Sequence, residues 1–211
     1  MNILAIDCIH ETCSAAFFDG KKVVSEIVES MERGQAERLL PMVREVLEKA
    51  HVGFEDVDAV AVTTGPGSFT GVRVGLAAAD GIALAANLPM IGVSMLEATA
   101  WKVYARFRDV KKLCLVLETK RDDFYAQCFE EGQSVTSPAV WNANDLKNLT
   151  GYVFAGNAVK RLVEEAGELP VIETTMPTAA DIALFASNKP AERKYPEPLY
   201  LREAEVTLCR K

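Results

Sequence analysis

The sequence predicts an α/β protein of two lobes, and three observations support this. The chain has 211 residues, which is long for a peptide module and short for two full-sized domains. Apolar residues make up 49% of it and charged residues 25%, the balance of a folded chain rather than a disordered one. Strand-like and helix-like segments alternate, and their order in the first half returns in shortened form. We expect a first lobe over residues 1–108 and a smaller second lobe over residues 109–211.

Three strands open the first lobe. Residues 3–6 form a short apolar run, and β-prone segments follow at residues 14–18 and 23–28. Between the last two stands Asp19-Gly20, a dipeptide typical of tight hairpin turns. The pattern therefore predicts one strand followed by a hairpin.

Helices and strands then alternate to the end of the lobe. Apolar residues repeat at three- and four-residue steps over residues 36–50, which marks one face of an amphipathic helix. Pro41 lies inside this pattern and should kink the helix or mark a late start. The remaining elements expected are a buried strand at 58–63, a helix at 72–86, a strand at 90–93 and a helix at 96–107.

The second lobe begins with two paired strands and continues with shorter elements. The strands are expected at residues 113–118 and 124–129. Helix, strand, helix, strand and helix should follow at 145–149, 152–155, 158–166, 171–172 and 179–187. No repeat is visible residue by residue, so the duplication concerns the order of elements alone.

Composition excludes several classes of function. Thirty acidic against 23 basic residues give a net charge of -7, which opposes tight binding of nucleic acid by this chain alone. The five cysteines are odd in number and form no CxxC pair, which indicates free thiols in a reducing compartment. The start MNILAID lacks a basic region followed by an apolar run, and no stretch of 18 apolar residues exists. We therefore expect a cytoplasmic protein with no signal peptide and no membrane span.

Histidines are too few for the usual metal and nucleophile sites. The chain has two, His10 and His51, in different segments and without HxxxH or HxxH spacing. A catalytic cysteine would have to pair His10 with Cys8 or Cys13. The two thiols are better explained as small apolar side chains in paired strands. No metal centre is expected.

The most distinctive segment is TTGPGSFTGVRVG at residues 63–75, a glycine-rich turn between a strand and a helix. Glycines there allow positive φ angles and close backbone approach, and Ser68 or Thr70 can cap the helix. The turn has no Lys-Ser or Lys-Thr pair and its spacing is G-x-G-x-x-x-G, so it is neither a P-loop nor a dinucleotide fingerprint. A tight structural turn is favoured, and an anion site at the helix N-terminus stays open.

The helix after this turn carries small residues over much of its surface. Gly71, Gly75 and Ala79 follow one another at four-residue steps, as do Gly81 and Ala85. A helix that is apolar all round must be buried in a water-soluble fold. Its own sheet should cover one part of it. The remaining face, together with the helix at 36–50, is a candidate surface for another subunit.

The end of the first strand resembles the first phosphate loop of the actin, sugar-kinase and heat-shock ATPase superfamily. Asp7 ends the strand, and Glu11, Thr12 and Ser14 follow in the hairpin. In that superfamily the acid holds a metal-nucleotide and the hydroxyls cradle phosphate. Asp7, Glu11 and Thr12 are therefore candidate ligands for nucleotide phosphate, and an Asp that caps a turn explains the pattern equally well.

Several motifs together resemble one family. They are MNILAID with ETCSAA, the helix sequence QAERLLP, the block TTGPGSFTGVRVGLAAADGIAL, and EPLYLR near the end. These motifs are similar to those of the TsaB (YeaZ) family, paralogues of TsaD in bacterial synthesis of the threonylcarbamoyladenosine at position 37 of tRNA. The resemblance implies an actin-like (ASKHA) fold of two ribonuclease-H-like lobes, the second one reduced.

The resemblance also implies partners. Family members pair with TsaD, TsaE joins the complex, and TsaD carries out the transfer, so this chain would be a non-catalytic scaffold that meets tRNA only through the complex. A homodimer is expected when the chain is alone, and ATP or ADP at the partner interface stays open. The helices at 36–50 and 72–86 would form the interface, through Gln35, Ala36, Leu39, Leu40, Val43, Gly71, Val72, Gly75, Leu76, Ala79 and Ile82.

The comparison with TsaD further implies an inert chain. TsaD holds its metal with a VNHMEGH motif, and Met95 and Thr99 stand here where its two histidines would be. The chain also departs from the usual family pattern at Gln35, at residues 118–125, and in Asp7-Cys8-Ile9-His10, which lacks phosphate-cradling hydroxyls. The alternative function is a free-standing nucleotide-dependent phosphotransferase or ATPase of the actin-like superfamily. A peptidase is disfavoured because no nucleophile–base pair is evident.

Overall fold

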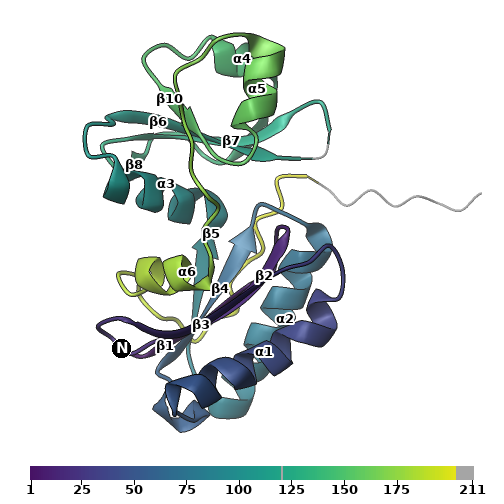
Figure 1. Cartoon of the computed structure of the whole chain (residues 1–211), viewed down its shortest axis with the longest axis vertical. Coiled ribbons are helices and arrows are strands. Elements are labelled where there is room, and N and C mark those ends of the chain that lie inside the picture. The colour runs from purple at the N-terminus through teal and green to yellow at the C-terminus, as the bar shows by residue number, and fades with distance from the viewer. Residues whose placement is uncertain (120, 203–211) are drawn as a thin grey trace, which may run out of the picture.

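Each of the two lobes is built on one β-sheet (Figure 1). The structure, a computed structural model, describes residues 1–119 and 121–202. The strand order is β3-β2-β1-β4-β5 in the first sheet and β11-β10-β6-β7-β8 in the second, where β9 also pairs with β7. The predicted α/β class is confirmed.

The first sheet mixes an antiparallel edge with a parallel centre. β1 (Ile3–Asp7) pairs antiparallel with β2 (Thr12–Phe18), which pairs antiparallel with β3 (Val23–Ser30). On its other side, β1 runs parallel to β4 (Ala59–Gly65), and β4 runs parallel to β5 (Met90–Ser94). Because β1 and β4 are buried along their whole length, both faces of this sheet must be covered.

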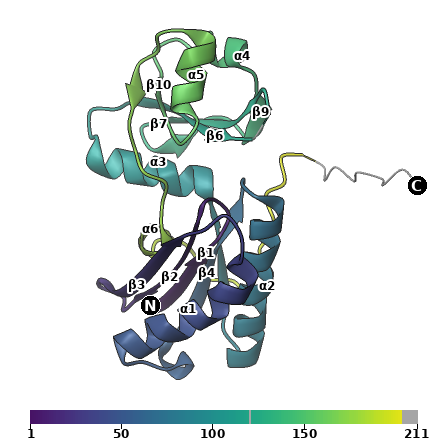
Figure 2. The ribbon, with the colours of Figure 1, turned by 45° about the vertical axis from the view of Figure 1, so that its right-hand side comes forward.

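Helices cover the two faces of the first sheet (Figure 2). α1 (Gln35–Ala50) and α2 (Phe69–Ala86) lie on one face, and α6 (Ala179–Ala186) lies on the other. Side chains of β1 alternate accordingly: Leu4 and Ile6 pack with the α1–α2 layer, whereas Ile3 and Ala5 pack with α6. A short 3-10 helix, η1 (Phe54–Asp56), follows α1.

The second sheet is covered on one face by its own helices and on the other by α3 (Met95–Arg106), which lies between the two sheets (Figure 1). Its strands are β6 (Lys112–Glu118), β7 (Phe124–Glu130), β8 (Gln133–Ser134), β9 (Ala139–Trp141), β10 (Val153–Ala155) and β11 (Val171–Ile172). Its helices are α4 (Ala143–Lys147) and α5 (Val159–Ala166).

The segment after α6 connects the lobes. Met90 of β5 and Glu192 exchange two backbone hydrogen bonds, so the segment first follows the edge of the first sheet. Leu199 then donates its amide to the Thr64 carbonyl over 2.8 Å. Arg202 ends the described residues in an ion pair with Asp123 of the second lobe. Thus α6, Glu192 and Leu199 contact the first sheet, although they come from residues 109–211.

The expected elements are present with bounds shifted by up to three residues, the largest shift being the start of α2 at Phe69 instead of Val72. The short strands β8 and β9 and the helix η1 were not predicted. Of the two alternatives expected for Pro41, a kink or a late start of α1, the late start is wrong, because the helix begins at Gln35 and Pro41 lies on its exposed side. Among the described helices, α2 alone has the length and mean hydropathy, 1.3, of a membrane span, a test that core helices also pass. Here one side of α2 packs on the sheet.

Candidate functional site

The glycine-rich turn packs directly on the loop between β1 and β2. The Ser68 amide donates a 2.8 Å hydrogen bond to the Ile9 carbonyl, and the Ser68 hydroxyl accepts from the Gly71 amide over 3.3 Å. A Cβ atom at Gly67 would lie 2.7 Å from the Ile9 carbonyl oxygen, and one at Gly71 would collide with the Cys8 carbonyl. The glycines therefore permit a close backbone approach, and Ser68 caps α2, as the tight-turn interpretation predicts.

The Asp7 side chain is buried where the glycine-rich turn packs on the loop between β1 and β2. This side chain ends β1 and is 1% exposed, and Oδ1 accepts a 2.6 Å hydrogen bond from the Thr63 hydroxyl. Oδ2 has no hydrogen-bond partner within the described chain. Burial raises the pKa of the carboxyl to about 6, against the lowering effect of the Thr63 hydrogen bond. Of the other predicted phosphate ligands, Glu11 is exposed and Thr12 is half-buried, so Asp7 does not share their access to solvent.

The neighbouring side chains are not activated for chemistry. The Cys8 thiol donates to the Gly71 carbonyl over 3.3 Å, and burial raises its pKa far above the usual range. Burial likewise raises the pKa of Cys13 to about 11 and lowers the pKa of His10 to about 4. At neutral pH both thiols are protonated and the imidazole is neutral, which leaves no thiolate nucleophile at this loop.

The positions matched to the metal-binding histidines of TsaD belong to the core. Met95 and Thr99 lie on α3 and are fully buried. The Thr99 hydroxyl donates a 2.6 Å hydrogen bond to the Met95 carbonyl one turn earlier, so it is committed to the helix backbone. In residues 1–119 and 121–202, no three His, Cys, Asp or Glu side chains gather as a metal site would require.

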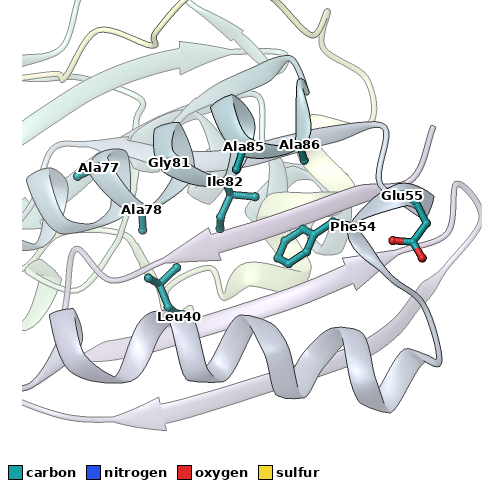
Figure 3. A pocket seen from close by; sticks show the side chains of 9 residues that line it. All are labelled: Leu40, Phe54, Glu55, Ala77, Ala78, Gly81, Ile82, Ala85 and Ala86. Carbon is teal, nitrogen blue, oxygen red and sulfur yellow. The ribbon is translucent and has the colours of Figure 1, made fainter.

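An apolar groove of about 600 Å³ runs between α1 and α2 (Figure 3). Leu40 of α1 and Phe54 of η1 border it and are 52% and 41% exposed. Its α2 wall consists of small or aliphatic residues, and Glu55 is its one charged lining residue. The lining residues of α2 are Ala77, Ala78, Gly81, Ile82, Ala85 and Ala86.

The predicted interface residues divide between this groove and the core. Leu40 and Ile82 line the groove, Ala36 is exposed on α1 four residues before Leu40, and the Gln35 side-chain amide donates to the Met31 carbonyl over 3.2 Å. The other predicted contacts are buried in the chain's own core: Leu39, Val43, Gly71, Val72, Gly75, Leu76 and Ala79.

The small residues of α2 form two stripes that have different neighbours. The first contains Gly71, Gly75 and Ala79, and the second contains Gly81 and Ala85. A Cβ at Gly75 would lie within 3.5 Å of Cys8 Sγ and Val62 Cγ2, because this stripe faces the sheet. A Cβ at Gly81 would have no neighbour within 4 Å, because the second stripe, with Ala85, faces the groove. Phe54, Ala78, Gly81 and Ala85 are groove residues that the interface prediction did not name. The four-residue step from Gly81 to Ala85 was the available signal.

Known proteins are similar to this chain in sequence and in fold. The family model "TsaD: tRNA N6-adenosine threonylcarbamoyltransferase" matches residues 22–203. The tRNA threonylcarbamoyladenosine biosynthesis protein TsaB of Escherichia coli (strain K12) is 34% identical over 96% of this chain and 95% of its own. The TsaB protein of Haemophilus influenzae is 38% identical over 59% of this chain and 58% of its own.

Two solved structures from Pseudomonas aeruginosa are close in fold. One, a protein with similarity to peptidase YEAZ, has a TM-score of 0.81 at 28% identity, covering 95% of this chain and 99% of its own. The other, YeaZ, has a TM-score of 0.74 at 27% identity, covering 88% and 90%. Component A of (R)-2-hydroxyglutaryl-CoA dehydratase from Acidaminococcus fermentans, at TM-score 0.55 and 14% identity over 90% and 98% of the two chains, shares the fold alone. These likenesses confirm the actin-like fold class, and the chain belongs to the TsaB (YeaZ) family.

Proposed function

We propose that this chain is a non-catalytic scaffold subunit in the biosynthesis of threonylcarbamoyladenosine in tRNA, and that it acts by binding TsaD. The names of its TsaB relatives support the role in this biosynthesis. The observation that carries the scaffold role is the exposed apolar groove between α1 and α2.

The groove has the character of a protein-binding surface. Large apolar side chains stand exposed along it, and Leu84, further along α2, is 82% exposed. Contiguous exposed apolar surface of this kind costs free energy in water and commonly marks a binding site. Alanine and glycine on the α2 wall allow a partner helix to approach the backbone closely.

TsaD is the proposed occupant because it shares this fold. The TsaD family model matches residues 22–203, a range that includes α1 and α2. Two paralogues can therefore bring equivalent helix pairs together around an approximate twofold axis. The same reasoning predicts a homodimer of this chain when TsaD is absent. TsaE would join the pair of subunits, and tRNA would meet this chain only through the complex.

The side chains of this chain that could have taken part in catalysis are buried, which supports the proposal that TsaD carries out the threonylcarbamoyl transfer. Asp7 is sealed against Thr63, and Met95 and Thr99 lie in the core. A free-standing nucleotide-dependent phosphotransferase or ATPase is the alternative. ATP or ADP at the partner interface also stays a proposal. Calorimetry with ATP and magnesium separates these functions, since micromolar binding with turnover by the chain alone would favour the enzyme.

Co-elution with TsaD tests the scaffold role. The purified chain and TsaD, mixed and run on a sizing column, should elute as one complex, and the gene should restore tRNA modification in a strain depleted of its own TsaB. Separate elution together with failed rescue would reject the proposal. An exchange of Val135, which is 49% exposed in the second lobe, for aspartate should leave both results unchanged.

A further inference from the structure

Two buried cysteines of the second sheet face each other across neighbouring strands. Cys114 of β6 and Cys128 of β7 are register partners, and neither is more than 1% exposed. Both side chains lie on the face that α4 and α5 cover. The proposed scaffold function uses neither thiol.

The backbone hydrogen bonds identify the kind of pair. The Cys128 amide donates to the Thr136 hydroxyl over 2.9 Å, and the Cys128 carbonyl accepts from the Val135 amide over 2.9 Å. Both backbone groups therefore point away from β6, so Cys114 and Cys128 form a non-hydrogen-bonded pair of the antiparallel ladder. Such pairs have Cα atoms about 4.5 Å apart, within the roughly 4.4–6.8 Å that a disulfide spans.

The two thiols also interact with each other. A hydrogen bond between them raises the pKa of Cys114 and lowers the pKa of Cys128, and a hydrogen bond with the Thr136 hydroxyl lowers the pKa of Cys128 further. Cys128 is thus the better nucleophile of the pair. Cys114 is close enough to react with the Cys128 sulfur once that sulfur is oxidised. At the other end of the chain, burial raises the pKa values of both Cys8 and Cys13.

A polar cluster at the rim of the sheet lies next to the pair. The next pair on the same face is Lys112 and Glu130, which form a 2.9 Å ion pair with side chains 45% and 38% exposed. The Tyr152 hydroxyl donates to Glu130 over 2.7 Å. These polar contacts are partly exposed, and the Tyr152 ring also packs on the cluster that contains the two thiols, so a small molecule would reach the thiols when the rim and this ring open locally.

We propose that Cys114 and Cys128 form a redox-modification site that hydrogen peroxide oxidises to a cross-strand disulfide. The Cys128 sulfur attacks one peroxide oxygen, the O–O bond breaks, and a sulfenic acid and one water form. The Cys114 sulfur then attacks the Cys128 sulfur, the S–O bond breaks, and the second water leaves. Both thiol hydrogens end in the two waters, and the peroxide takes up two electrons.

Peptide mapping of the full chain after treatment with hydrogen peroxide tests the proposal. Trypsin cuts after Lys112, Lys120, Arg121 and Lys147, so Cys114 and Cys128 fall on separate peptides, 113–120 and 122–147. We expect these two peptides to be joined, with the loss of two hydrogens, and to separate on reduction. In Cys114→Ser the link should disappear and dimedone should label Cys128, whereas Cys8→Ser should form the link as wild type does.

Oxidation of the other three cysteines in place of this pair would contradict the proposal. Cys8 and Cys13 share the tryptic peptide 1–21, and Cys209, outside the described residues, lies on peptide 203–210. Oxidation at these cysteines while Cys114 and Cys128 remain open to alkylation after unfolding would overturn the proposal. The map of the wild-type chain alone decides this, even if Cys114→Ser does not fold. No TsaD is needed, so the outcome is independent of the scaffold function.

Discussion

The Thr63 hydroxyl donates a 2.6 Å hydrogen bond to Oδ1 of Asp7 and so joins the ends of β4 and β1. Both residues are buried, and the glycine-rich turn packs on the loop that follows Asp7. An acid that resembled a phosphate-loop residue in the sequence is therefore held inside the first lobe. Its side chain contributes to the packing of two strands and a turn, and its charge has measurable consequences.

Asp7 should make folding less favourable as its carboxyl ionises. Its pKa is raised from 3.8 to about 6 in the folded chain, so the unfolded chain loses this proton at lower pH. Relative to Asp7→Asn, the free energy of unfolding of the wild type should fall by roughly 2 kcal/mol as the pH rises from about 4 to about 6. Urea denaturation of both proteins across this window measures the difference.

The comparison with Asp7→Asn is needed because His10 has the opposite effect. Its pKa is lowered to about 4, so protonation of the unfolded chain lowers stability as the pH falls below about 6.5. This contribution is common to both proteins and cancels in the difference. A difference that stays constant between pH 4 and pH 6 would contradict the buried, shifted Asp7.

Removal of the Thr63 hydroxyl should weaken the fold at neutral pH. Thr63→Val leaves the buried carboxylate without its side-chain donor, a loss of about 1–3 kcal/mol. The pKa of Asp7 should also rise further, because this hydrogen bond lowers it. Thr64→Val is the matched control, since the Thr64 hydroxyl donates a longer bond of 3.3 Å to the neutral Val93 carbonyl. Carbon-13 NMR of the Asp7 carboxyl and urea denaturation check the two effects.

Alanine should have opposite effects at two glycines of α2. At Gly71 the added Cβ collides with the Cys8 carbonyl, so Gly71→Ala should destabilise the fold by about 1–3 kcal/mol. At Gly81 the Cβ meets nothing within 4 Å, so Gly81→Ala should stabilise the helix by up to about 1 kcal/mol. Thermal unfolding of the two variants compares them. Equal effects would show that α2 does not sit as close to the β1–β2 loop as described.

The sequence predicted the regular elements well because their apolar patterns are local. The hairpin at Asp19-Gly20, the helix with Leu39 and Val43 on one face, and the buried strand before Gly65 all have the expected periodicity. The strand β8 was missed because its two residues, Gln133 and Ser134, are polar and exposed, and β9 (Ala139–Trp141) was missed as well. The turn between β7 and β8 places Glu131 at a φ of 50°, a conformation that glutamate does not signal.

The residues that line the groove were only partly anticipated from the sequence, because periodicity does not distinguish two apolar faces of one helix. The interface prediction took the strongest apolar stripe, whose members Leu76 and Ala79 pack on the chain's own sheet. The groove uses the weaker stripe of Gly81 and Ala85 and gains Phe54 from a separate helix. The link from Arg202 to Asp123 depends on how distant segments fold together, which no local pattern encodes.

The affinity of Gly81→Leu for TsaD tests the scaffold role most directly. A Cβ at Gly81 would meet nothing within 4 Å and this residue lines the groove, and helix propensity favours leucine over glycine, so the variant should fold. Calorimetry should show TsaD binding weakened at least about tenfold, which corresponds to ~1.4 kcal/mol, while Val135→Asp binds as the wild type does. Unchanged affinity of Gly81→Leu would contradict docking through the groove between α1 and α2.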